Sequence, residues 1–125
     1  MSIESLGIVS EFMESLGLNY EFMEWTSDPV YPYFVGEYQE IPQPNEDGEE
    51  ESTFILTGFS RDSWIQLEEA KEKIKEHFSK VGKIVTTESN SAMAIFYANS
   101  FPIQTGDAEL KKIQINLTVK EWSVN

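Results

Sequence analysis

The chain of 125 residues has the size of one compact domain, and its 40% hydrophobic and 25% charged residues are typical of a globular protein with a filled core. It contains no cysteine, which excludes a disulfide framework, a thiolate nucleophile and the usual structural zinc site. The longest uncharged apolar run, residues 92–98, is far shorter than the roughly 20 residues of a membrane-spanning helix, and no basic segment precedes the first apolar residues. We therefore expect a soluble protein that carries no export signal and does not bind membranes.

The net charge of −13 is unevenly distributed along the chain. Residues 1–51 contain 13 Asp or Glu and no Lys or Arg, whereas residues 52–125 contain 9 acids and 9 bases. Such a surface repels phosphate, so we expect no specific binding of nucleic acid. Four interpretations of the acidity stay open: it binds a basic protein, imitates a nucleic acid, lines a channel through which DNA slides, or only maintains solubility.

The first predicted helix begins after Ser2, whose hydroxyl can cap it, and ends near Leu16. Gly17 favours this end, because glycine adopts the left-handed conformation that terminates helices. Apolar residues recur at helical spacing along one predicted buried stripe: Ile3, Leu6, Val9, Phe12, Met13 and Leu16.

Three strands are predicted next. Residues 20–25 are rich in aromatic side chains, and residues 30–41 follow after Asp28-Pro29, with Pro32 arguing for an edge position or an irregular start. Residues 53–59 form the third strand. Residues 42–52 contain two prolines and a run of acids, so we expect an exposed acidic hairpin loop at about 42–52 between the second and third strands.

A second helix is predicted from Ser63, which forms a capping box with Gln66, and it ends at Gly82. Its apolar stripe consists of Trp64, Leu67, Ala70, Ile74, Phe78 and Val81. Strands are predicted at 83–88, 92–103 and 112–122, and the last alternates apolar and polar residues most regularly.

The predicted order is helix, three strands, helix, three strands, in one domain that spans residues 1–125. We expect an α+β fold in which two amphipathic helices pack on one face of a mostly antiparallel sheet of about five or six strands.

Enzyme signatures are weak, and the sequence predicts a protein that is not an enzyme and needs no cofactor. The only histidine, His77, lies on the second helix and is interpreted as a surface or structural residue. No glycine-rich loop that could hold a phosphate is found. The acidic loop fails as a calcium-binding EF-hand, because the first and twelfth positions are Gln43 and Phe54, so we predict no metal site.

Contact with a partner is the better-supported use of the polar and aromatic segments. The aromatic segment around 31–38 has more rings than one strand face can bury, and tyrosine is favoured at interfaces. Ordinary core and edge packing remains the alternative for these rings. Our predicted partner or lumen contacts are Glu46, Asp47, Glu49, Glu50, Glu51, Tyr31, Tyr33, Tyr38 and Arg61.

Three segments of the chain, together with the predicted order of helices and strands, resemble the tail-terminator or tail-completion proteins of long-tailed bacteriophages. They are Val-Tyr-Pro-Tyr-Phe-Val-Gly-Glu-Tyr at 30–38, Phe-Ser-Arg-Asp-Ser-Trp at 59–64 and Ile-Gln-Ile-Asn-Leu-Thr-Val-Lys-Glu-Trp at 113–122. The resemblance implies a small α+β protein that forms a homo-hexameric ring, caps the tail tube and joins it to the head connector. It also implies a place in the virion tail, with assembly in the host cytoplasm, and a negative lumen that DNA passes without adhering.

Two functions are therefore considered. The first is a ring-forming structural protein of a phage tail, whose partners are other copies, the tail-tube protein and the head connector. The second is an acidic inhibitor that mimics DNA and blocks a nucleic-acid-binding enzyme, which requires carboxylates spread along rigid elements. Because 5 acids between Glu46 and Glu51 crowd one predicted loop, the first function is favoured.

Overall fold

The computed structural model describes residues 1–25, 28, 30–41, 49–61, 63–78, 83–86 and 91–122. Within these ranges it contains two helices and six strands, and the α+β class is confirmed. The elements in chain order are α1 (Ile3–Ser15), β1 (Tyr20–Phe22), β2 (Tyr33–Ile41), β3 (Glu49–Ser60), α2 (Trp64–His77), β4 (Lys83–Thr86), β5 (Ala92–Ile103) and β6 (Lys111–Trp122).

The strands form one sheet in the order β1-β2-β3-β6-β5-β4. The predicted antiparallel character holds for the pairs β2–β3, β3–β6, β6–β5 and β5–β4. It fails for β1, which runs parallel to β2, so the sheet is mixed. No tight hairpin joins β1 to β2. β2 begins beside the start of β1, so the two strands run in the same direction.

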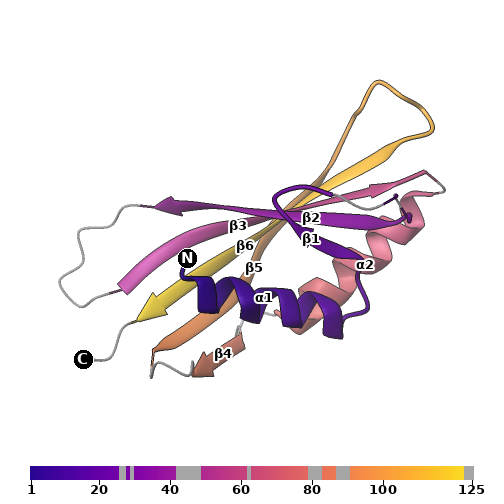
Figure 1. Ribbon diagram of the computed structural model, residues 1–125. Coiled ribbons are helices and arrows are strands. Elements are labelled where there is room, and N and C mark those ends of the chain that lie inside the picture. Colours follow the sequence, from indigo (N-terminus) through magenta and orange to yellow (C-terminus); the bar gives the residue numbers. More distant parts are fainter. Residues whose placement is uncertain are drawn as a thin grey trace.

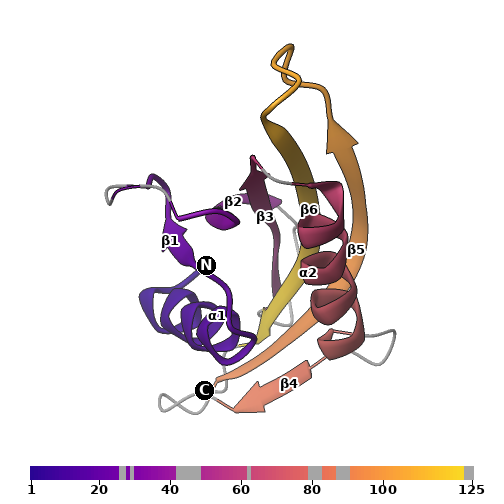
Figure 2. The ribbon, with the colours of Figure 1, turned by 90° about the vertical axis from the view of Figure 1, so that its right-hand side faces the viewer.

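The sheet curls into a half-barrel, and both helices lie against its concave face (Figure 1, Figure 2). Alternate residues of the central strands point into this face, where they meet the apolar stripes of the helices. One cluster combines buried side chains of both helices and of the sheet. Its members without exposed surface include Val9, Met13, Phe34, Phe54, Leu56, Leu67, Ile74, Phe78, Met93, Ile95, Ile115, Leu117 and Val119.

Two glycines let aromatic rings lie flat on the concave face. A Cβ at Gly58 would stand 2.4 Å from the ring of Phe34, which is its cross-strand partner on β2. A Cβ at Gly36 would stand 2.5 Å from Phe54 and 2.7 Å from the ring of Tyr20. Any side chain at these positions would push the rings away, so the sequence needs glycine there to close the core.

The predicted helix starts need three corrections. Ser2 caps α1 by accepting a hydrogen bond from the Ser5 amide, as expected, but Ile3 is 90% exposed and does not belong to the buried stripe. Ser63 makes no side-chain cap for α2, and the Gln66 side chain does not close the capping box but accepts a hydrogen bond of 2.8 Å from the Ser60 hydroxyl. Trp64 is 40% exposed, since the first turn of α2 lies at the margin of the sheet.

The acidic loop is shorter than predicted. Glu49, Glu50 and Glu51 belong to β3, where β6 pairs with all of them and β2 reaches as far as Glu51. Pairing with β6 overrides the poor strand propensity of consecutive glutamates. The remaining part of the predicted loop, 42–48, lies outside the described residues. So do Val81 and Gly82, which were predicted to close the second helix; in the described part, α2 ends at His77.

The close approach at Gly58 predicts a strong contrast between two alanine substitutions. Gly58→Ala forces the Phe34 ring out of the core and should lower the free energy of unfolding by about 1–3 kcal/mol. Gly7→Ala is the matched control, because Gly7 lies inside α1 with no heavy atom within 4 Å of the added carbon. It should raise the free energy of unfolding by up to about 1 kcal/mol through helix propensity. Urea unfolding measures both values, and equal effects would contradict the assigned packing.

Burial of the Tyr20 side chain raises its pKa to about 12. In the unfolded chain a tyrosine ionises near pH 10, so the folded state resists ionisation and its stability should fall as the pH rises from about 10 to about 12. Absorbance titration of tyrosine should show a late-ionising group that Tyr20→Phe removes. Loss of a group that titrates at or below pH 10 in this variant would contradict the buried position.

Candidate functional site

An aromatic cluster lies on the convex face of the sheet, opposite the helices. Tyr33 is its centre: the ring centroid lies 4.9 Å from that of Trp25, 5.3 Å from that of Tyr31 and 4.9 Å from that of Phe59. Tyr33 and Phe59 are direct partners on β2 and β3, so strand register brings their rings together. We call Trp25, Tyr31, Tyr33 and Phe59 the aromatic cluster.

Two cations border the aromatic cluster. The Arg61 guanidinium lies 5.6 Å from the centroid of the Tyr31 ring, and its Nε donates a hydrogen bond of 3.1 Å to the Tyr31 hydroxyl. The Lys112 ammonium lies 5.6 Å from the centroid of the Phe59 ring, its cross-strand partner. Both positive charges thus rest on aromatic faces, which attract cations.

A groove with a volume of about 300 Å³ opens beside the cluster. Its lining includes Met23, Trp25, Tyr33, Phe59 and Lys112. Met23 has a φ of 70°, and the Glu24 amide donates to the Phe22 carbonyl at 2.9 Å, so a strained γ-turn holds the 61% exposed Met23 side chain at the rim. The buried Trp25 indole nitrogen has no hydrogen-bond partner among the described residues. The groove therefore offers apolar rings and an ammonium group, while the indole nitrogen lies buried behind its surface.

The polar groups of the cluster influence one another. Burial raises the pKa of the Tyr33 hydroxyl, the neighbouring Tyr31 raises it further, and the positive charge of Arg61 acts in the opposite direction. The hydrogen bond to Tyr31 is the main cause that raises the pKa of Arg61. Tyr31 and Arg61 therefore behave as one hydrogen-bonded unit that keeps its positive charge.

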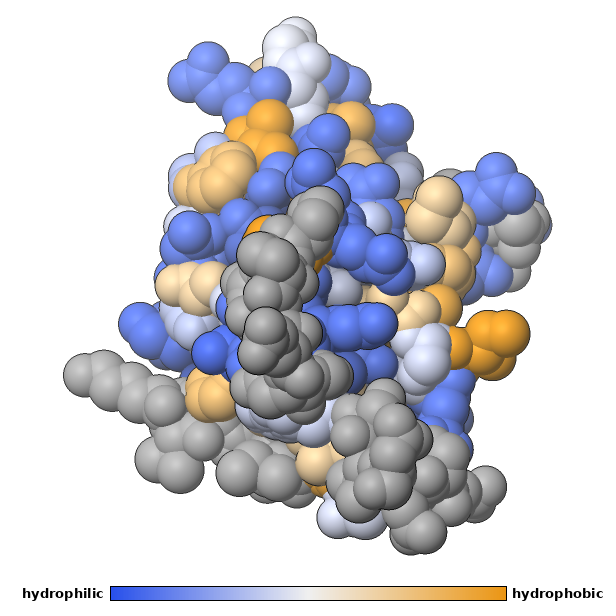
Figure 3. Space-filling model, turned by 90° about the vertical axis from the view of Figure 1, so that its left-hand side faces the viewer, coloured by the Kyte–Doolittle hydropathy of each residue, from blue (hydrophilic) through white to orange (hydrophobic). Residues whose placement is uncertain are grey.

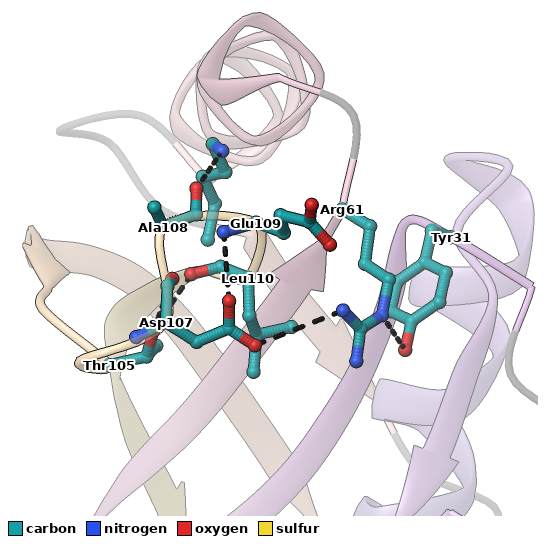
Figure 4. A network of polar contacts seen from close by, with 8 residues as sticks. Tyr31, Arg61, Thr105, Asp107, Ala108, Glu109 and Leu110 are labelled. Atoms are coloured by element: carbon teal, nitrogen blue, oxygen red, sulfur yellow. Dashed lines mark hydrogen bonds and ion pairs between the residues drawn. The ribbon is translucent and has the colours of Figure 1, made fainter.

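Arg61 also links the cluster to the β5–β6 hairpin (Figure 4). Its guanidinium lies 3.9 Å from the Asp107 carboxylate in the hairpin loop. That carboxylate accepts a hydrogen bond of 2.9 Å from the Glu109 amide, and the Thr105 hydroxyl lies 2.9 Å from the Leu110 carbonyl oxygen. Local hydrogen bonds thus fix the shape of the loop, and Arg61 ties it to the aromatic cluster.

The predicted contact residues divide into separate groups. Tyr31, Tyr33 and Arg61 meet in the aromatic cluster, as described above. Tyr38 points to the concave face, where its ring stacks on Phe22 with centroids 6.1 Å apart. Glu46 and Asp47 lie outside the described residues.

Glu49, Glu50 and Glu51 begin β3, whereas Phe59 lies near the end of this 12-residue strand. About 30 Å of strand separates the two groups at the usual rise per residue. Alternation along the strand places Glu49 and Glu51 on one face and Glu50 on the other. The Glu49 carboxylate lies 3.8 Å from the Lys120 ammonium. Glu50 faces Glu121 of β6, which accepts a hydrogen bond of 3.0 Å from Ser5 on α1.

Figure 3 views the molecule from the side at which β2 ends and β3 begins. In the part that is not drawn in grey, hydrophilic residues dominate and apolar ones are scattered between them. We call the residues Glu49, Glu50, Glu51 and Glu121 the acidic end of the sheet. The aromatic cluster occupies the other end.

Sequence analysis missed Trp25, Phe59 and Lys112 as members of the cluster. Phe59 and Lys112 could have been found from the sequence, because each occupies the polar face of a regularly alternating strand. Trp25 could not, since it follows the end of β1 and reaches Tyr33 only through the fold.

In the described ranges, the His, Cys, Asp and Glu side chains form no group of three or more that could hold a metal ion. His77 packs edge-on against the ring of Phe12, with centroids 5.3 Å apart, between the two helices. Neither helix in the described part of the chain is long and apolar enough to cross a membrane.

Comparison with known proteins gives no relative: no family model matches the chain, and none of the curated proteins matches it.

The central position of Tyr33 makes it the residue on which the aromatic cluster depends. Tyr33→Ala removes three ring contacts from a half-buried site and should lower the free energy of unfolding by about 2 kcal/mol. Phe101→Ala, on the same convex face but 44% exposed, is the control and should cost less than about 1 kcal/mol. Chemical unfolding measures both, and equal costs would show that the cluster does not stabilise the fold.

Proposed function

We propose that the protein is a structural subunit of a bacteriophage tail, of the tail-terminator or tail-completion type, which assembles into a ring. In this role it caps the tail tube and joins it to the head connector. The proposal rests on the resemblance of residues 30–38, 59–64 and 113–122 to that family and on the shape of the molecule.

The observation that supports this role best is the chemical difference between the two ends of one long sheet. Glutamates gather where β3 begins, and rings and cations gather where it ends. A joining protein must contact one body on one side and another body on the other, so two different surfaces held apart by rigid strands fit the task. An enzyme would instead need reactive groups that converge.

The β5–β6 hairpin gives further support. It projects beyond the helices and the other strands (Figure 1, Figure 2), and Phe101 on β5 is 44% exposed. A ring needs head-to-tail contacts between unlike surfaces of neighbouring copies. A projecting hairpin with an exposed ring and a loop fixed by hydrogen bonds is suited to contact a neighbouring copy.

The DNA-mimic inhibitor remains the second candidate, because Glu49–Glu51 lie on a rigid strand and not in a loop. The predicted crowding of acids in one loop, which favoured the ring-forming protein, therefore no longer distinguishes the two functions. Two features count against the mimic: the three carboxylates are divided between the two faces of β3, and the Lys120 ammonium lies beside Glu49. A DNA mimic needs an unbroken line of negative charge on one face.

Light scattering across a concentration series, at low and at moderate salt, tests the ring. Moderate salt screens the repulsion between chains of net charge −13, so the mass should rise with concentration towards six copies of the 14.3 kDa chain, and more readily at moderate salt. A mass that stays at one or two copies throughout, at both salt concentrations, would contradict the ring and favour the inhibitor.

A further inference from the structure

One edge of the sheet is left open along β2. β1 pairs with β2 only from Phe34 to Gly36, whereas β2 continues to Ile41 (Figure 1). The Phe34 amide donates to the Asn19 carbonyl and the Gly36 carbonyl accepts from the Met23 amide, each at 2.7 Å. The backbone groups of even-numbered residues therefore point away from β3, and the register to β3 is unbroken up to Ile41.

By the same alternation, the amide and carbonyl groups of Tyr38 and Glu40 point to the outer edge. Among the described residues neither backbone has a hydrogen-bond partner on that side. The Glu40 side chain does not block the edge, since its carboxylate turns to the amino group of Met1, 2.7 Å away. Tyr38–Ile41 is thus a four-residue open edge and a template for another strand, whereas Met23, whose amide donates to the Gly36 carbonyl, lies opposite Glu37.

At the opposite side of the sheet, β5 extends beyond its pairing with β4 and forms the edge there. This edge is protected against pairing with another strand. The Tyr97 amide points outward, because it donates to the Phe78 carbonyl at 2.9 Å. Tyr97 faces Leu117 and Pro102 faces Ile113, so the nitrogen of Pro102 also points outward. Proline has no amide hydrogen to donate, and this edge is closed to regular pairing. The open edge of β2, Tyr38–Ile41, contains no proline.

We propose that the open edge of β2 binds the same edge of a second copy, antiparallel, with Gln39 of one chain facing Gln39 of the other. Tyr38 of each copy then faces Glu40 of the other, and these two pairs exchange four backbone hydrogen bonds across a two-fold axis. The pairing ends at Ile41, because Met23 lies opposite Glu37 on the outer side of β2. In this register no glutamate faces a glutamate.

Neighbouring registers fail for reasons of charge or space. If Glu40 faced Glu40, two like charges would lie side by side at the edge. If Tyr38 faced Tyr38, Glu40 would need the outward groups of Gly36, whose carbonyl already accepts from Met23. The register centred on Gln39 is also the one that pairs both outward-facing residues of the open edge, Tyr38 and Glu40.

This pairing joins the same edge of both copies, so it is complete with two chains. Once two copies have joined, neither has any of this edge left, so the contact gives pairs and does not propagate into fibres. It differs from the head-to-tail contacts that a ring requires, and it stands whether or not the protein forms a ring.

A cysteine at Gln39 tests the pairing, because the natural chain has no cysteine. In the proposed register residue 39 forms a pair without direct hydrogen bonds, with Cα atoms about 4.5 Å apart, within the range of a disulfide. Gln39→Cys should form a cross-linked dimer when oxidised glutathione accepts the two electrons of the thiols. Glu37→Cys is the matched control: it lies on the same face of the same strand, is also exposed and does not face itself across the two-fold axis.

We expect Gln39→Cys to cross-link at least tenfold faster than Glu37→Cys on a non-reducing gel. Equal rates for the two variants would overturn the register. Circular dichroism establishes that both variants fold. A second test uses charge: Gln39→Lys and Gln39→Glu should each sediment as a lighter species than an equimolar mixture of the two, and a mixture no heavier than the separate variants would also overturn the proposal.

Discussion

The stacking of aromatic rings on bare glycine backbone is the constraint on which the rest of this structure depends. Phe34 covers Gly58, and Phe54 and Tyr20 cover Gly36. Because no Cβ stands between ring and strand, the rings lie close to β2 and β3, and the concave face has room for two helices. Side chains at these glycines would lift the rings, and the apolar stripes of α1 and α2 could no longer reach the sheet.

Placing both helices on the concave face decides what the other surfaces can do. Neither α1 nor α2 lies on the convex face, so the aromatic cluster and its two cations stay within reach of a partner. The short β1 and Met23 cover only the first part of β2, so Tyr38–Ile41 have no neighbouring strand on their outer side among the described residues. The long strands hold an acidic end and an aromatic end apart. The surfaces that we propose for assembly are therefore direct consequences of how the core is filled.

Local signals predicted the elements well where periodicity was strong. The alternation of 112–122 and the spacing of Leu67, Ala70 and Ile74 correspond to β6 and to the buried side of α2. The start of β3 was wrong because its glutamates oppose strand formation locally and depend on pairing with β6, which is distant in sequence. The capping box failed for a similar reason, since Ser60 competes for the Gln66 side chain. Tyr31, Tyr33 and Arg61 were predicted to contact a partner, but the sequence did not show that they meet Trp25, Phe59 and Lys112, because strand register and the path of the chain after β1 bring these residues together.

We propose above that this protein assembles into a ring of six copies. Electron microscopy of the purified protein, at the highest concentration that stays monodisperse in moderate salt, tests it most directly. Class averages should show annular particles with six-fold symmetry and an open centre. Fields that contain only compact particles, with the size of one or two chains and no central opening, would contradict the ring and with it the structural role in a phage tail.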